Sequence, residues 1–278
     1  MKRIVTVQDI SCVGKCSLTV ALPVISAMGV ETSVIPTAVL STHTAFKDFT
    51  FRDLTDDITG IAEHWKKEKI TFDAIYTGYL GSFKQLKLVS DFFDEFKEEN
   101  TLIFVDPVMG DFGRLYTGFT QEFASEMAKL CSKADIIVPN MTEAAFMLGV
   151  EYIGEGYNEE YVKDLLYKLS ALGPKKVVLT GISFDCNTVG VMGYDSTTKE
   201  YFSYFNEKIN ANYHGTGDVF ASCCVGALMN GYTLEESLKI AADFTVTSIK
   251  KSMDDKDSRW YGVNFESAMP YLINRISK

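Results

Sequence analysis

Short apolar runs alternate with longer amphipathic segments along most of this 278-residue chain. The apolar runs predict buried strands at 3–8, 30–36, 73–77, 101–105, 135–138 and 176–180. The segments between them predict helices at 17–28, 53–67, 84–98, 120–131, 142–148 and 158–172. This alternation is typical of a parallel sheet with helices on both faces. The pattern therefore predicts an α/β fold with three layers and a mainly parallel central sheet.

The pattern changes in the last third of the chain. Residues 187–205 alternate apolar and polar positions around Asp195-Ser196-Thr197, which predicts a small antiparallel hairpin at the edge of the sheet. Three further helices are predicted at 216–230, 233–251 and 264–276. No repeat, low-complexity stretch or linker is evident, so we expect residues 1–278 to form a single domain.

Composition narrows the class of partner. A net charge of −10 argues against nucleic acid and anionic membrane surfaces, but not against small anionic substrates. No apolar run approaches the ~18 residues of a membrane-spanning helix. The N-terminus runs directly into a strand pattern without a signal-peptide cleavage site, which predicts a cytoplasmic protein. The six cysteines have neither C-x-x-C nor zinc-site spacing, so we expect reduced thiols.

The motif with the clearest chemical meaning is Gly215-Thr216-Gly217-Asp218, which opens an apolar run that continues to Met229. Glycines let the backbone approach a ligand closely, and a helix N-terminus favours an anion. A carboxylate beside such an anion hole suits the deprotonation of an alcohol during phosphoryl transfer. The alternative is an ordinary helix cap, with the glycines serving only the turn.

Polar residues gather where the predicted strands end. In an open parallel sheet, ligands bind at the carboxyl ends of the strands. We therefore expect one site to be formed by the 215–218 turn together with Asp9, Thr44, Gly78, Tyr79, Asp106, Asn140, Glu143 and Thr180.

The run from Asp106 to Asp111 is typical of a loop that binds a metal ion together with phosphate. Its acidic residue stands at a strand end before a proline and a glycine. Mg²⁺ prefers one or two carboxylates plus waters and phosphate oxygens, so we expect Asp106 and Asp111 as ligands and Glu143 to act through water. The alternative for Glu143 is an acid in the first turn of a helix, stabilised by the helix dipole.

Two familiar motifs are excluded. A P-loop at Gly14-Lys15 would need glycine at position 9 and Ser or Thr at 16, where the chain has Asp9 and Cys16. A dinucleotide fingerprint at Gly215 would need a third glycine, where the chain has Phe220.

Histidines and aromatic residues in the predicted loops add candidates for ligand contact. His43 and His214 lie in strand-end loops, whereas His64 lies in a charged stretch and is expected on the surface. Three aromatic residues are candidates for stacking on a planar ligand, with ordinary packing as the alternative: Phe46, Tyr79 and Tyr116.

Five motifs complete the site: Ser41-Thr42-His43-Thr44, Thr77-Gly78-Tyr79-Leu80-Gly81-Ser82, Asp106-Pro107-Val108-Met109-Gly110, Pro139-Asn140-x-x-Glu143 and Gly215-Thr216-Gly217-Asp218. With these motifs, the chain resembles the pyridoxal kinases of the ribokinase-like superfamily along nearly its full length. The glycine-rich element is shared across that superfamily, whereas the His-Thr and Gly-Tyr-Leu-Gly-Ser elements resemble the vitamin B6 branch.

The resemblance implies a ribokinase-like fold and ATP-dependent phosphorylation of the 5′-hydroxymethyl group of pyridoxal, pyridoxamine or pyridoxine. Asp218 would be the general base, and the amides of Gly215, Thr216 and Gly217 the anion hole. The substrate contacts would be Asp9, Ser11, His43, Thr44 and Tyr79. The ATP contacts would be Asp106, Asp111, Tyr116, Asn140, Glu143 and Thr180, and the Mg²⁺ ligands Asp106, Asp111 and Glu143. A K⁺ ion is a further cofactor that the resemblance allows, and a homodimer is the expected assembly.

One departure from the family concerns the substrate pocket. The family commonly has Gln-Ser-His after the first strand, where this chain has Gln8-Asp9-Ile10. Asp9 can accept a hydrogen bond from a ring hydroxyl or a protonated ring nitrogen. Two other functions stay open: a hydroxymethylpyrimidine kinase of thiamine synthesis, whose branch tends to carry Cys after the glycine-rich turn, and a silent B6-vitamer-binding protein.

Overall fold

The computed structural model describes residues 1–211 and 213–277, and the chain divides into two compact units. The first unit consists of Met1–Ala74 and Ile209–Lys278, and the second of Ile75–Lys208. The expectation of one domain over residues 1–278 stays a prediction.

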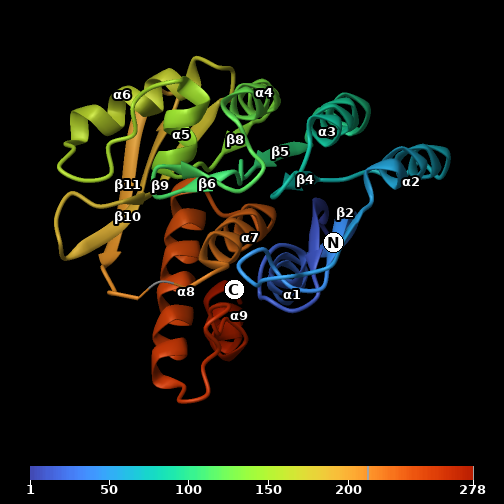
Figure 1. Ribbon diagram of the computed structural model, residues 1–278. Helices are drawn as coiled ribbons and strands as arrows, with labels where there is room; N and C mark the ends of the chain where they lie inside the picture. The colour runs from blue at the N-terminus through green and yellow to red at the C-terminus, as the bar shows by residue number, and fades with distance from the viewer. Residues whose placement is uncertain (212, 278) are drawn as a thin grey trace. The chain divides into compact units, whose positions relative to one another are not determined.

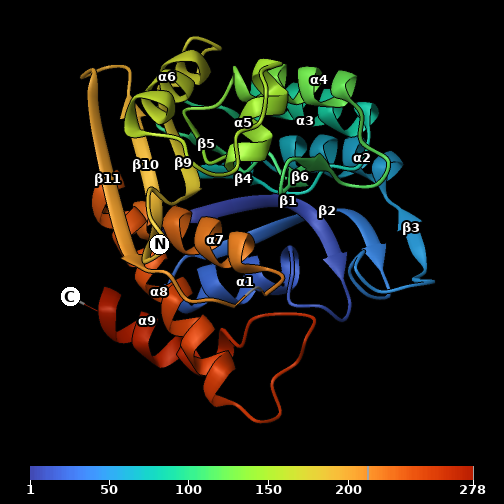
Figure 2. The ribbon, with the colours of Figure 1, turned by 60° about the vertical axis from the view of Figure 1, so that its left-hand side comes forward.

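The first unit contains three neighbouring sheet strands in the order β1-β2-β3. Their bounds are β1 (Arg3–Ser11), β2 (Glu31–Leu40) and β3 (Phe51–Asp53). β1 and β2 are parallel, and β3 pairs antiparallel to β2. The helices are α1 (Leu18–Ala27), α2 (Thr55–Lys67), α7 (Thr216–Met229), α8 (Leu234–Asp254), the 3₁₀ helix η1 (Glu266–Ala268) and α9 (Met269–Ile276). α2 lies on one face of β1 and β2, and α1 and α7 lie on the other (Figures 1 and 2).

Small residues on α7 allow that helix to pack closely on α1 and α8. A Cβ on Gly226 would lie 2.5 Å from the Sδ atom of Met28, so a larger residue there would displace the Met28 side chain. Cys223 and Cys224 are buried on the same helix and act as small core residues. All six cysteines are free thiols.

The second unit contains six strands in the order β4-β5-β8-β9-β10-β11, and its first strand begins at the unit boundary. Their bounds are β4 (Ala74–Thr77), β5 (Leu102–Val105), β8 (Ile136–Ile137), β9 (Lys176–Ile182), β10 (Thr188–Asp195) and β11 (Glu200–Glu207). A separate hairpin is formed by β6 (Gly110–Asp111) and β7 (Arg114–Leu115). The helices are α3 (Phe83–Phe96), α4 (Gln121–Cys131), α5 (Met141–Leu148) and α6 (Glu159–Ser170). They pack in sequence, α3 on α4, α4 on α5 and α5 on α6 (Figure 2).

The α/β fold with a mainly parallel sheet is confirmed. β5, β8 and β9 pair in parallel, as do β1 and β2, and the predicted antiparallel edge is the β10–β11 hairpin. Within the described part of the chain, no helix is both long and apolar enough to cross a membrane.

Two predicted strands end too early. The strand predicted at 3–8 continues as far as Ser11, because Ile10 pairs with Val39 and Ser11 with Leu40. Likewise, the strand predicted at 30–36 continues to Leu40. The short strands β3, β6 and β7 were not predicted, since two or three residues carry no readable periodicity.

Candidate functional site

The predicted turn at Gly215–Asp218 is the N-terminus of α7, in the first unit. Gly215 is the N-cap with φ of 80°, and a Cβ there would lie 2.0 Å from the carbonyl oxygen of Lys15. Both facts require glycine at this position. Within the described residues, no side chain caps this helix, and Asp218 lies in its first turn as predicted. Helix N-terminal amides without a side-chain cap can bind an anion.

Asp218 lies in a setting that favours its protonated form. Burial above all, and then the charge of Asp9, raise the pKa of this carboxyl to about 7, while the backbone N–H of Ser17 opposes the rise by donating a hydrogen bond. Part of the Asp218 surface still faces solvent. A half-buried carboxyl with a pKa near neutral pH suits proton transfer.

Asp9 and Ser11 lie next to this carboxyl, at the end of β1. Both are buried, and the Ser11 hydroxyl donates to Oδ2 of Asp9 at 3.0 Å. The hydroxyl of Ser17 donates to Asp9 as well, and burial is the main reason that the Asp9 pKa is raised. Ser17 thus binds Asp9 with its side chain and Asp218 with its backbone. Ser17 was not predicted as a site residue, because its left-handed backbone, with φ of 53°, cannot be recognised from the sequence.

His43 is buried with both ring nitrogens in hydrogen bonds. Its Nε2 lies 2.8 Å from the carbonyl oxygen of Tyr261, and its Nδ1 accepts from the backbone N–H of Ala45 at 3.1 Å. These partners define a neutral ring with the proton on Nε2, and burial lowers its pKa. His43 can therefore offer a ligand its ring face or edge, but no free nitrogen. Thr44 follows in an exposed turn.

Aromatic rings surround His43. The ring of Phe46 lies 5.0 Å from it, that of His214 4.9 Å and that of Trp260 6.1 Å, centroid to centroid. Trp260 and Phe46 are 4.6 Å apart, and Trp260 remains 60% exposed. Trp260 and Tyr261 were missed as site residues. Two adjacent aromatic residues between two predicted helices were the signal that the sequence offered.

In the second unit, the predicted phosphate–metal loop is folded by the β6–β7 hairpin. Asp106 directly follows β5 and is buried, and its backbone N–H donates to the carbonyl of Thr77 at 3.0 Å. Asp111 lies on the hairpin and is exposed, with one oxygen accepting from the N–H of Phe112. A Cβ on Gly110 would lie 2.6 Å from the Arg114 carbonyl oxygen, so glycine allows the hairpin to close.

Glu143 holds this loop to α5. Its Oε1 accepts from the N–H of Met109 at 3.1 Å, and its Oε2 from the N–H of Asn140 at 2.9 Å. Asn140 in turn accepts from the N–H of Glu143, which completes a capping box, and donates to the Gly110 carbonyl at 2.9 Å. Burial, above all, raises the Glu143 pKa to about 8, and the charge of Asp111 contributes. Glu143 is thus a buried capping acid rather than one on a helix surface.

The remaining predicted residues lie near these elements of the second unit. The Tyr79 ring lies 5.5 Å from that of Phe119, and the exposed Tyr116 donates its N–H to the Met109 carbonyl at 2.9 Å. Thr180 bonds to the Pro139 carbonyl through its backbone N–H at 3.0 Å. Over residues 1–211 and 213–277, no three His, Cys, Asp or Glu side chains gather as a ready-made metal site.

Two groups of predicted residues are therefore assembled, one in each unit. Asp9, Ser11 and Asp218 form a hydrogen-bonded cluster with Ser17. Asn140 and Glu143 hold the loop that carries Asp111. The convergence of both groups on one ligand stays a prediction.

Comparison with known proteins places the chain among small-molecule kinases. The sequence model of the phosphomethylpyrimidine kinase family matches residues 21–260. A curated relative, the pyridoxal kinase of Dictyostelium discoideum, is 25% identical over 296 residues, with 98% of this chain and 96% of that protein covered.

Solved structures agree in fold and extend the similarity. A Bacteroides thetaiotaomicron protein described as a phosphomethylpyrimidine kinase, in a crystal form with pyridoxal, is 40% identical. It matches with a TM-score of 0.93, covering 98% of this chain and 95% of that one. The pyridoxal kinase of Lactobacillus plantarum is 28% identical, with a TM-score of 0.89 and coverage of 99% and 97%.

Proposed function

The chain belongs to the phosphomethylpyrimidine kinase family, and from this premise we propose that it is an ATP-dependent kinase of vitamin B6. Its substrate would be the 5′-hydroxymethyl group of pyridoxal, pyridoxamine or pyridoxine. The observation that carries this proposal is the half-buried Asp218 in the first turn of α7, beside amides that no described side chain caps. The 40% identical relative that was crystallised with pyridoxal supports the substrate class.

The reaction assigns one task to each part of the α7 N-terminus. The ionised Asp218 accepts the proton of the 5′-hydroxyl as its oxygen attacks the γ-phosphorus of ATP. The bond from that phosphorus to the β-bridging oxygen breaks, which releases ADP. The amides of Gly215, Thr216 and Gly217 stabilise negative charge on the transferred phosphoryl group. Such enzymes depend mainly on positioning and charge stabilisation.

Asp9 and Ser11 form the polar end of the proposed substrate pocket. Asp9 would accept a hydrogen bond from the ring hydroxyl or the protonated ring nitrogen, in place of the serine common in the resembled family. Its carboxylate already accepts from Ser11 and Ser17, which fixes its orientation before a ligand arrives. His43, Thr44 and Tyr79 would line the ring, with His43 contributing its ring surface.

The carboxylates of the second unit suit Mg²⁺ held jointly with ATP. Asp106 and Asp111 supply the one or two carboxylates that Mg²⁺ takes when phosphate oxygens and waters complete its shell. Both Glu143 oxygens already accept backbone N–H bonds, so Glu143 would act through a water. When bound, Mg²⁺ would neutralise charge on the phosphates. Asn140, Tyr116 and Thr180 would complete the nucleotide site.

A hydroxymethylpyrimidine kinase is the second candidate, because the matching family takes its name from that chemistry. Steady-state kinetics with Mg-ATP on pyridoxal, pyridoxamine, pyridoxine and hydroxymethylpyrimidine separate the two. We expect the largest kcat/KM for a B6 vitamer. A larger value for the pyrimidine would replace the proposed substrate, and binding without turnover would indicate a silent vitamer-binding protein.

We also propose that the protein acts in the cytoplasm, and that it forms a homodimer, as its resemblance implies. Sedimentation velocity at micromolar concentration measures the second point. A single species at the 31.0 kDa chain mass would contradict it.

A further inference from the structure

Residues Trp260–Glu266, which we call the C-terminal clasp, bind loops that are distant in sequence but belong to the same unit. The carbonyl of Tyr261 lies 2.8 Å from Nε2 of His43. The N–H of Val263 donates to the carbonyl of His214 at 3.2 Å. The clasp thus holds both the 41–46 loop and the residue that directly precedes Gly215.

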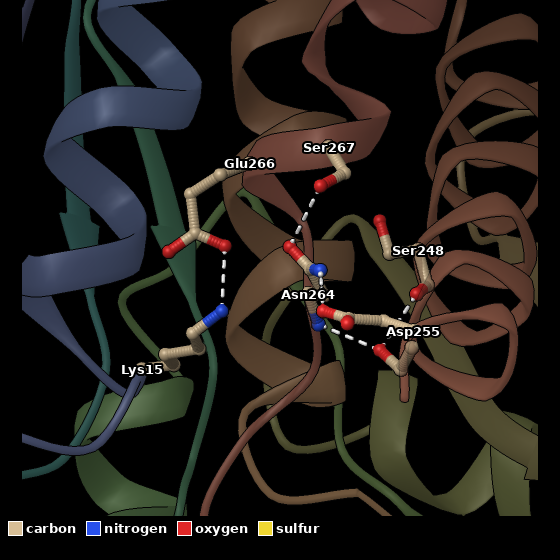
Figure 3. A network of polar contacts seen from close by, with 7 residues as sticks. Lys15, Ser248, Asp255, Asn264, Glu266 and Ser267 are labelled. Atoms are coloured by element: carbon tan, nitrogen blue, oxygen red, sulfur yellow. Dashed lines mark hydrogen bonds and ion pairs between the residues drawn. The ribbon is translucent and has the colours of Figure 1, made fainter. Parts of the chain in front are cut away.

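The clasp also binds the loop between β1 and α1. Nζ of Lys15 lies 2.7 Å from Oε2 of Glu266 and 5.7 Å from the centroid of the Phe265 ring. Figure 3 shows the Lys15 side chain directed at the Glu266 carboxylate. Gly262 packs on the same loop, since a Cβ there would lie 2.6 Å from Cβ of Lys15 and 2.9 Å from the carbonyl oxygen of Gly14.

Lys15 connects the clasp to the α7 N-terminus. Its side chain is bound by Glu266, while its carbonyl oxygen lies against Gly215, so close that no Cβ fits between them. The φ of Lys15 is 55°, in the left-handed region that costs a non-glycine residue about 1 kcal/mol or more. This conformation therefore needs support from its neighbours, and the clasp provides it.

The clasp is itself anchored to α8. The hydroxyl of Ser252 accepts from the N–H of Asn264 at 2.7 Å, and the Asn264 amide donates to Asp255 at 3.0 Å. Ser267 donates to the same Asn264 side chain at 3.1 Å, as Figure 3 shows. These bonds hold the backbone next to Glu266, the residue that binds Lys15.

We propose that the clasp is a positioning device for the phosphoryl-transfer site, in which Lys15 and Glu266 hold the β1–α1 loop against Gly215. This inference rests on the proposed kinase function. Neither Lys15 nor residues 261–266 fall within the 21–260 region that the family model matches. The clasp would act on the vitamer and the transfer step, and not on the affinity for ATP.

A steric wedge tests the packing. Gly262→Ala would insert a methyl group against the backbone of Gly14, and a displacement of about 1 Å can cost ~100-fold in rate. We expect kcat/KM for pyridoxal to fall at least ~10-fold, with KM for ATP within twofold of wild type. Gly60→Ala on α2 is the matched control, because its new Cβ would have no neighbour within 4 Å.

Charge variants test the ion pair. Lys15→Met and Glu266→Gln should each raise KM for pyridoxal about two- to fivefold, the range expected for a partly exposed pair. The double reversal Lys15→Glu/Glu266→Lys should recover most of the loss. Lys2→Met breaks a pair of equal length at the opposite end of β1 and should leave the kinetics unchanged.

The outcomes separate this inference from the proposed function. A wild-type protein without kinase activity would remove the function itself. Full activity in Gly262→Ala and in both charge variants would overturn the clasp alone. A loss in Lys15→Met that Glu266→Gln does not share, and that charge reversal does not rescue, would mean that Lys15 contacts a ligand directly, which also overturns the clasp. Thermal unfolding of every variant identifies those that lose activity by unfolding.

Discussion

The two units each contain a helix whose third residue is acidic, yet these two acids are used in opposite ways. In α5, Glu143 turns back and accepts hydrogen bonds from Met109 and Asn140, so that both carboxylate oxygens are satisfied by the protein. In α7, Asp218 follows the N-cap Gly215, which has a left-handed backbone and no side chain that could cap the helix. The N-terminus of α5 is closed by its own residues, and that of α7 is left to a ligand.

The N-cap residue explains the difference. Asn140 has a side chain that accepts from the N–H of Glu143, and the reciprocal bond completes the capping box. Gly215 has no side chain to offer. Both acids have raised pKa values for the same main reason, burial, so a raised pKa alone does not distinguish a structural acid from a reactive one.

The largest expected effect tests the reactive acid. Asp218→Asn removes the proposed base while keeping the shape of the side chain, so kcat should fall at least ~100-fold, the usual scale for loss of a general base. Pyridoxal and ATP should still bind, which calorimetry would measure. Turnover near the wild-type value would remove Asp218 from the mechanism.

The next largest effect is a loss of folding stability when Glu143 is replaced. Glu143→Ala leaves the buried N–H of Met109 and the partly buried N–H of Asn140 without their acceptor, and an unpaired buried donor costs about 1–3 kcal/mol. We expect the free energy of unfolding, measured in urea, to drop by about 2–4 kcal/mol. Glu143→Gln keeps one acceptor oxygen and should lose less.

Asp218→Asn is measured in the same urea experiment, and its effect on the free energy of unfolding should have the opposite sign. The folded-state pKa of Asp218, about 7, lies above the ordinary value of 3.8. Stability therefore falls as pH rises from 3.8 to about 7, and the ionised carboxylate destabilises the fold above that pH. At pH 8, Asp218→Asn should be at least as stable as wild type. A loss equal to that of Glu143→Ala would show that both acids are structural.

The sequence predicts which residues form the two helix N-termini better than it predicts their tertiary contacts. Glycine spacing and helix-capping patterns are local, so the sequence identifies Gly215, Asp218, Asn140 and Glu143. The contact of His43 with Tyr261 is not identified in this way, because these residues are 218 positions apart and meet only through tertiary packing.

Strand ends show the same limit. The predicted strand covered residues 3–8 and so stopped before Asp9 and Ser11, yet β1 continues through both. Backbone pairing with β2 decides their structure, and the alternation of side chains allows polar residues in a strand whose end forms a site. The mistake moved a boundary by three residues, but left Asp9 and Ser11 as site candidates.

The smallest expected effect separates Asp9 from Asp218. The ionisable groups that face Asp218 within its unit are Asp9 on β1 and the thiol of Cys16, whose pKa is raised by burial and by both carboxylates, so it stays neutral. Because Asp218 must be ionised to accept a proton, kcat/KM for pyridoxal should rise with pH through about 7.

Asp9→Asn removes the negative charge that raises the Asp218 pKa, so this rise should move to lower pH by about one unit or less. Glu31→Gln removes an exposed carboxylate at the start of β2 and should leave the profile in place. If Asp9→Asn lowers kcat/KM equally at every pH, Asp9 acts only as a substrate contact. A shift of the profile would instead mean that Asp9, within the cluster around Ser17, sets the basicity of Asp218. Glu143, by contrast, is held by its capping box and takes no part in proton transfer in the proposed reaction.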